Sequence, residues 1–172
     1  MKSLLSHRLS MDGIKDICLL VQGEQNHSLK ELLYQLTLDD DRRVAVNALW
    51  TFTHFTAADN GWLYAKHDQL IDRCLKEHDP TKLRLILSIL LRQPFEEETV
   101  RTDFIDFCLA RFTDARAPYA IRALCIKLAY EQMKYWSELL NELRQMLDLI
   151  SNEPLSPGLR SAWRQVMKKI KA

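Results

Sequence analysis

Hydrophobic residues recur along this chain at a spacing of 38 residues, without a gap, over four successive segments. Three columns of the repeat run through all four segments: Leu33, Ile71, Leu109 and Leu147; Leu36, Cys74, Phe112 and Ile150; and Phe52, Leu90, Leu128 and Val166. Within each segment, apolar residues recur at i, i+3, i+4 and i+7, the spacing of a helix with one buried side. Such a period predicts a solenoid of stacked helical units, and we expect the whole first column to be buried.

The pattern divides each segment into two helices. Helix pairs are predicted at about 27–37 and 41–57, 62–76 and 80–93, 98–113 and 117–133, and 136–150 and 156–171. Asp79-Pro80, Pro118 and Ser156-Pro157 mark the starts of second helices, because a capping residue followed by proline favours a helix start. Asp59-Asn60-Gly61 and Arg92-Gln93-Pro94 are predicted breaks between pairs.

The first 26 residues stand outside this register. Ile14, Ile17, Cys18 and Val21 nevertheless have helical spacing, which predicts an N-terminal helical cap over the open apolar end of the first repeat. The chain is therefore predicted to be a single domain over 1–172, with the cap at 1–26 and repeats at about 27–60, 61–96, 97–134 and 135–172.

The turns and second helices carry further repeated residues. Asp41 and Asp79 lie in the turns inside repeats, and Arg84, Arg122 and Arg160 form a column in the second helices. Paired helices with these features resemble HEAT or armadillo-type repeats over residues 27 to about 171. The chain departs from that family in its period, shorter than about 40–47, and in having Val46 where later repeats have Arg. The resemblance implies an all-α, right-handed α-solenoid. Tetratricopeptide repeats would need a period near 34 and a small-residue signature, and the chain has neither.

Charge and composition limit the classes of function that the chain is expected to have. The 24 basic and 23 acidic residues leave a net charge of +1, which lacks the basic footprint of a dedicated nucleic-acid binder. There is no apolar run long enough for a membrane span and no signal-peptide pattern at the start, so we expect no membrane association. The cysteines show no C-x-x-C pair and fall mostly in apolar columns, so they are expected to be reduced and buried in a cytoplasmic protein: Cys18, Cys74, Cys108 and Cys125.

No catalytic, metal-binding or cofactor-binding motif occurs in the sequence. The five histidines lack metal-ligand spacing, and no glycine-rich phosphate loop or nucleophile motif is present. The tryptophans occupy unrelated columns and are expected to pack at helix ends and caps: Trp50, Trp62, Trp136 and Trp163. The chain is therefore expected to be non-enzymatic, without a metal or a cofactor.

The outward side of the second helices is the candidate partner-binding face, because this side commonly lines the binding surface of helical-repeat solenoids. Its polar and aromatic residues suit a protein or peptide partner: Arg43, Asn47, Thr51, His54, Arg92, Tyr119, Lys127, Tyr130, Gln165 and Lys168. The apolar residues Leu85 and Ile89 belong to the same side, unless neighbouring helices cover them.

The arginine column is a candidate anion-binding ladder. Arg84, Arg122 and Arg160 would align about 10 Å apart in stacked repeats. Alternatively, each arginine pairs with the turn aspartate of its own or a neighbouring repeat. Arg164 joins the candidate anion-binding set, because the final helix carries five basic residues and no acid from Arg160 to Ala172.

Three functions follow from these patterns. The leading hypothesis is a non-enzymatic scaffold that binds protein or peptide on the second-helix face. The alternative is nucleic-acid binding, since HEAT-like repeats similar to these occur in DNA glycosylases of the alkylation-repair type, although this chain is shorter and nearly neutral. A third is an enzyme with an unrecognised site near Trp50, His54 and the Asp59-Asn60-Gly61 turn, which only proximity in sequence supports.

Overall fold

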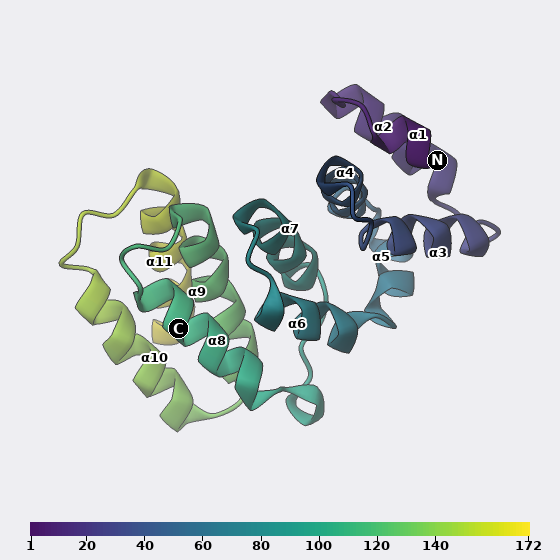
Figure 1. Cartoon of the computed structure of the whole chain (residues 1–172). Coiled ribbons are helices and arrows are strands. Elements are labelled where there is room, and N and C mark those ends of the chain that lie inside the picture. Colours follow the sequence, from purple (N-terminus) through teal and green to yellow (C-terminus); the bar gives the residue numbers. More distant parts are fainter. The chain divides into compact units, whose positions relative to one another are not determined.

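The computed structural model describes residues 1–172 and contains helices but no strand (Figure 1). The chain forms two compact units, residues 1–93 and residues 94–172. The first unit holds α1 (Lys2–Leu5), α2 (Met11–Val21), α3 (His27–Leu36), α4 (Arg42–Phe52), α5 (Ala57–Tyr64), α6 (His67–Lys76) and α7 (Pro80–Leu91). The second holds a 3-10 turn η1 (Glu97–Thr99), then α8 (Thr102–Thr113), α9 (Tyr119–Met133), α10 (Ser137–Ile150) and α11 (Pro157–Lys171). The predicted break at Arg92-Gln93-Pro94 coincides with the boundary between the units.

Capping chemistry fixes the starts of the second helices. The Asp41 carboxylate accepts hydrogen bonds from the backbone N–H groups of Arg43 and Val44, and Asp79 does the same for α7. Ser156 caps α11. Pro80 and Pro157 occupy the first helical position, where the missing N–H costs nothing. The predicted starts of α7 and α11 are confirmed to within a residue.

The segment between α4 and α6 differs from the prediction. A helix at 41–57 and a break at Asp59-Asn60-Gly61 were expected, but α4 ends at Phe52, and α5 runs through Asp59 and Gly61. Thr56 caps α5 by accepting a hydrogen bond from the Asp59 N–H, and the Asp59 carboxylate lies in the first turn, where negative charge is favourable. Such a cap contributes about 0.5–2 kcal/mol, which is comparable with the cost of Gly61 inside the helix, about 1 kcal/mol.

In the first unit, α4 is the central helix and packs against α1, α2, α3 and α7. The predicted cap residues Ile14, Ile17, Cys18 and Val21 are all buried, and α2 lies against α4. In the second unit, α9 has the central place, with α8, α10 and α11 packed on it (Figure 1).

Burial confirms two of the three apolar columns in full, those that contain Leu36 and Phe52. In the first column, Leu33, Ile71 and Leu147 are buried, but Leu109 is partly exposed, so the prediction for Leu109 was wrong. The reason is the rotation of α8, which turns Phe104, Cys108 and Phe112 into the core instead. The stripe of α3 is rotated in a similar way, and Leu32 is 46% exposed.

Polar contacts join consecutive repeats at spacings close to the sequence period. Arg73 of α6 donates to the hydroxyl and the carbonyl oxygen of Thr37, 36 residues earlier, at 2.8 and 3.0 Å. The Tyr34 hydroxyl donates to Gln69, 35 residues later, at 3.3 Å. Each contact joins equivalent parts of neighbouring repeats. These hydrogen bonds, together with the apolar core, therefore hold the repeats in register.

Candidate binding surface

The N-terminal residues cover the predicted partner-binding face on α4. The Asn47 side chain donates to the carbonyl oxygens of Leu5 and His7 at 2.8 and 3.0 Å, and Asn47 is buried. Thr51 is fully buried, and its carbonyl oxygen accepts a hydrogen bond from the Cys18 thiol. As a correction to the candidate set, Asn47 and Thr51 are therefore closed to a partner, because α1 and α2 pack on the outward side of α4.

The remaining candidates in the first unit do not form a continuous surface. Leu85 and Ile89 of α7 are buried. The Arg92 guanidinium donates to the carbonyl oxygens of Phe52, Thr53 and Phe55, so it satisfies the open carbonyl end of α4. Of the other two, Arg43 is exposed near the start of α4, and His54 is exposed beyond its end.

The three arginines of the predicted column lie in different environments. Arg122 is 1% exposed; its Nε donates to the Phe112 carbonyl oxygen at 2.8 Å, and its Nη2 lies 2.9 Å from the Glu153 carboxylate. Arg122 thus closes the end of α8 and ties down the loop before α11, and it is not available to an external anion. Its acidic partner lies in the neighbouring repeat, but it is Glu153 rather than a turn aspartate. Arg84 and Arg160 are exposed, with no acidic partner.

Helix α11 carries the one group of candidates that share an exposed face. Four basic residues point away from the core, and we call them the α11 basic face: Arg160, Arg164, Lys168 and Lys171. At about 100° per residue, they fall within an arc of about 80°. None of their side chains makes a hydrogen bond or an ion pair. Their charges are therefore available to a partner.

The sequence of α11 explains why this face is basic and exposed. Leu159, Ala162 and Val166 are buried on the opposite side, where α11 packs against α9 and α10, and Met167 is buried at the edge of the basic face. The Trp163 indole donates to the Leu147 carbonyl oxygen at 2.9 Å and anchors α11 to the end of α10. Lysines in the last turn also interact favourably with the helix dipole.

Two open hollows flank the basic face. One, of about 370 Å³, is lined by Leu155, Pro157, Arg160, Ser161, Arg164 and Gln165. The other, of about 440 Å³, is lined by Trp163, Arg164, Met167, Lys168, Lys171 and Ala172. Arg164 lies on the rim of both. Apolar walls beside exposed cations suit a side chain or chain segment that carries both apolar and acidic groups.

Helix α9 carries the other accessible candidates of the second unit. Tyr119 is 51% exposed at its start, and Lys127 and Tyr130 are partly exposed. Lys169 of α11 lies 5.0 Å from the centre of the Tyr130 ring and 3.4 Å from the Glu131 carboxylate. The fifth cation of α11 is therefore neutralised, whereas the four on the basic face are not.

Comparison with known protein families bears on the resemblance that the repeat pattern suggested. A family model described as a HEAT repeat domain matches residues 1–170. The chain belongs to the HEAT repeat family. The match includes residues 1–26, which the 38-residue register had left out as a cap. The comparisons with curated proteins and with solved structures found no match.

HEAT repeat chains stack helix pairs into α-solenoids, and the all-helical structure is consistent with that architecture. Domains of this family generally act as scaffolds. In this HEAT repeat chain, no group of three or more His, Cys, Asp or Glu side chains could hold a metal ion. No helix is long and apolar enough to cross a membrane. All four cysteines are free and buried, and burial raises the pKa of Cys18 to about 11.

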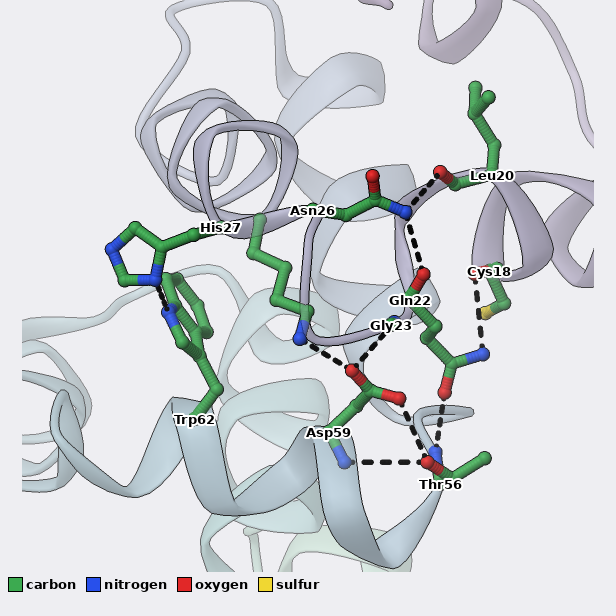
Figure 2. Close-up of polar contacts among 10 residues, drawn as sticks. Cys18, Leu20, Gln22, Gly23, Asn26, His27, Thr56, Asp59 and Trp62 are labelled. Carbon is green, nitrogen blue, oxygen red and sulfur yellow. Dashed lines mark hydrogen bonds and ion pairs between the residues drawn. The ribbon is translucent and has the colours of Figure 1, made fainter.

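The first unit of this HEAT repeat chain contains a polar cluster that its sequence did not predict (Figure 2). Lys30 is 4% exposed, and its ammonium lies 2.5 Å from Asp59 Oδ1. Burial opposes the ionisation of Asp59, but hydrogen bonds from Lys30, the Gly23 N–H and the Thr56 hydroxyl outweigh it and hold the pKa of Asp59 below its usual value. A lysine beside an apolar stripe gives no sequence signal of burial, because such a residue is usually solvated.

The same cluster contains Trp62, one of the four tryptophans. The Trp62 indole donates to His27 Nδ1 at 2.9 Å, from α5 to the start of α3 (Figure 2). Trp50 and Trp136 are likewise partly exposed and lie edge-on to His54 and Tyr135. These contacts agree with packing roles. The cluster joins the α2–α3 loop to α5, because the Asp59 carboxylate of α5 accepts a hydrogen bond from the Gly23 N–H (Figure 2).

Proposed function

We propose that this HEAT repeat domain is a non-enzymatic scaffold in which the α11 basic face binds an acidic segment of a partner protein. The observation that carries the proposal is the set of four exposed, unpaired cations on one side of α11. No acid occurs from residue 154 to residue 172 to neutralise them. Like-charged side chains within one arc repel each other slightly, and an acidic ligand relieves that repulsion.

The partner protein would also contact uncharged groups beside the α11 basic face. Exposed ion pairs contribute about 0.2–1 kcal/mol each, so four of them give orientation and fast association rather than high affinity. The hollows on both sides of Arg164 offer apolar contact, and Gln165 and Ser161 supply hydrogen-bonding groups beside it. The accessible candidates on α9, Tyr119 and Lys127, would extend the same surface.

A protein segment fits this face better than a nucleic acid does. From Arg160 to Lys171 the face is about 16 Å long, at 1.5 Å per helical residue. Helix α10, which packs on α11, exposes Glu138, Glu142 and Asp148. A short acidic segment matches the length of the basic face, whereas a long polyanion extends beyond it. The nucleic-acid alternative is therefore kept as one outcome of the test.

Two further properties belong to the same proposal. A family model that runs over residues 1–170 supports one functional domain for the whole chain. Four free, buried thiols suit a reducing compartment, which supports a cytoplasmic location.

The test uses the full chain and a fluorescent peptide with about six Asp and Glu residues, enough to span about 20 Å when extended. A second peptide carries Asn and Gln at the same positions. We expect the acidic peptide to bind, the neutral one to bind at least about tenfold more weakly, and binding to weaken from about 50 to about 200 mM salt.

Reversing the charges at Arg160, Arg164, Lys168 and Lys171 to Glu should abolish binding of the acidic peptide. Two double variants make the comparison equal in charge: Arg160→Glu with Arg164→Glu should weaken binding strongly, whereas Lys76→Glu with Arg84→Glu, which reverses two exposed charges in the first unit, should not. Equal loss in both variants would contradict the proposal. Tighter binding of a short DNA duplex than of the peptide, lost in the same fourfold variant, would overturn it in favour of nucleic acid.

A further inference from the structure

Two arginines of the α11 basic face line the same hollow. Arg160 and Arg164 border the hollow of about 370 Å³ beside the first turns of α11, together with Leu155, Pro157, Ser161 and Gln165. The two arginines are exposed and four residues apart, so their Cα atoms are separated by about 6 Å along the helix. Both guanidinium groups can therefore reach a single ligand in this hollow.

The polar side chains of this hollow offer hydrogen-bond donors, and no carboxylate lies among them. Neither guanidinium makes a hydrogen bond or an ion pair within the chain. The Ser161 hydroxyl oxygen accepts a hydrogen bond from the Gln165 side-chain amide at 3.3 Å. That contact leaves the O–H group of Ser161 as a donor. A ligand that satisfies this hollow therefore carries negative charge and several acceptor oxygens.

A hollow in the first unit provides a contrast. It measures about 310 Å³ and has basic residues in its lining, but Asp72 and Glu77 lie beside them. Its arginine, Arg73, donates to the hydroxyl and the carbonyl oxygen of Thr37. The charges of that hollow are compensated within the chain, whereas those of the two arginines on α11 are not.

The chemistry of arginine distinguishes phosphate from carboxylate. The planar fork of donors on a guanidinium binds a phosphate through two parallel hydrogen bonds. A phosphate monoester carries a charge of about −1.5 to −2 at pH 7 and three acceptor oxygens, whereas a carboxylate carries a single charge and two oxygens. Two guanidinium forks and a hydroxyl therefore match a phosphate monoester more fully than they match one carboxylate.

We propose that this hollow binds a phosphorylated serine or threonine within the acidic segment of the partner protein. Arg160 and Arg164 both donate to the phosphate, and Ser161 adds a third donor. The inference rests on the proposed function, because it names the chemistry of the segment that the α11 basic face binds. Lys168 and Lys171 bind the acidic side chains on one side of the phosphate, since an ammonium group acts as a point charge. The phosphate thus fixes the position of the segment along α11.

Peptides that differ at one position test this inference with the full chain. Each carries acidic residues around a central phosphoserine, glutamate or serine, and binding is followed by fluorescence anisotropy. The phosphoserine peptide should bind at least about tenfold more tightly than the glutamate peptide. The serine peptide should bind more weakly than either, because it has the least negative charge.

An exchange of arginine for lysine separates phosphate recognition from charge. Arg160→Lys with Arg164→Lys keeps both positive charges but removes both guanidinium forks. It should bring the affinity for the phosphoserine peptide to within about twofold of that for the glutamate peptide, whose own affinity should change little. The matched control is Arg43→Lys with Arg84→Lys, which makes the same exchange at exposed positions of the first unit and should alter neither affinity.

Failure of this inference differs from failure of the proposed function. If the glutamate peptide binds the basic face but the phosphoserine peptide binds no more tightly, phosphate recognition is overturned and the proposed function stands. A preference for phosphoserine that survives in Arg160→Lys with Arg164→Lys overturns the inference in the same way. If none of the peptides binds, both are overturned. Every substituted residue is exposed, so circular dichroism should show unchanged helix content in all variants.

Discussion

Arg42, at the start of α4, binds Asp79, the residue that caps α7 in the next repeat. Arg42 Nη2 lies 3.2 Å from Asp79 Oδ1, and the same oxygen accepts hydrogen bonds from the backbone N–H groups of Thr81 and Lys82. One carboxylate therefore starts a helix and joins two repeats. The hydrogen bond from Arg42 is the main reason that the pKa of Asp79 is lowered.

Asp79→Ala should lower the free energy of unfolding by about 0.5–2 kcal/mol, the range for loss of a capping residue. The loss should fall toward the upper end, because the link to Arg42 disappears as well. Urea denaturation measures it. Asp40→Ala is the control, since Asp40 is exposed in the preceding turn and caps no helix. An equal effect of the two substitutions would contradict the role given to Asp79.

The buried pair of Lys30 and Asp59 should respond unequally to loss of one partner. Asp59→Asn leaves a buried ammonium without its counterion, which should cost about 3–5 kcal/mol. Lys30→Met combined with Asp59→Asn should recover part of that loss, because it removes the unpaired charge. Urea denaturation of the single and double variants measures the coupling. Additive losses would mean that the two side chains act independently.

Acid should weaken the first unit through the same carboxylate. The folded-state pKa of Asp59 is lowered, so the unfolded chain binds more protons in acid. The stabilisation is present above the unfolded pKa of about 3.9 and is lost as pH falls through the lower, folded value. The urea midpoint of Asp59→Asn, followed from about pH 7 to about pH 3, should therefore fall less steeply than that of the wild type. Parallel curves would assign the acid sensitivity to other carboxylates.

Leu147→Ala should cost about 2–5 kcal/mol, the range for a fully buried leucine. Leu109→Ala should cost less than about 2 kcal/mol, because Leu109 is partly in water already. Both substitutions remove the same atoms from equivalent positions of the repeat, so the difference reports the rotation of α8. Equal losses on urea denaturation would show that Leu109 is buried in solution.

The sequence predicted features that depend on local chemistry. Asp79-Pro80 and Ser156-Pro157 located helix starts because capping involves only residues within one turn. Prediction from the sequence failed where a segment distant in the chain determines whether a side chain is buried or paired. Asn47 is a polar residue on an outward helix side, and only its hydrogen bond to the Leu5 carbonyl oxygen reveals that the N-terminal helices cover it. Lys30 was missed for the same reason, since Asp59 lies 29 residues away. For Arg122 an acidic partner in its own or a neighbouring repeat was one of the two readings, but the partner is Glu153 rather than a turn aspartate.

The α11 basic face was only partly foreseeable. The absence of acids from residue 154 onward and the helical spacing of Arg160 and Arg164 could be read from the sequence. Whether an arginine forms an ion pair depends on the tertiary structure. Arg122 pairs with Glu153, whereas Arg160, at the equivalent position of the next repeat, has no acidic partner. The repeat therefore predicts equivalent positions but not equivalent environments.

NMR can locate the surface on which the chain binds an acidic segment. The acidic peptide would be titrated into the isotope-labelled full chain, and the shifts of backbone amide signals would be followed. We expect the largest shifts on Arg160 to Lys171 and on the exposed residues of α9, and we expect the neutral peptide to produce much smaller shifts at the same concentration. Shifts that cluster in the first unit, or none on α11, would contradict it.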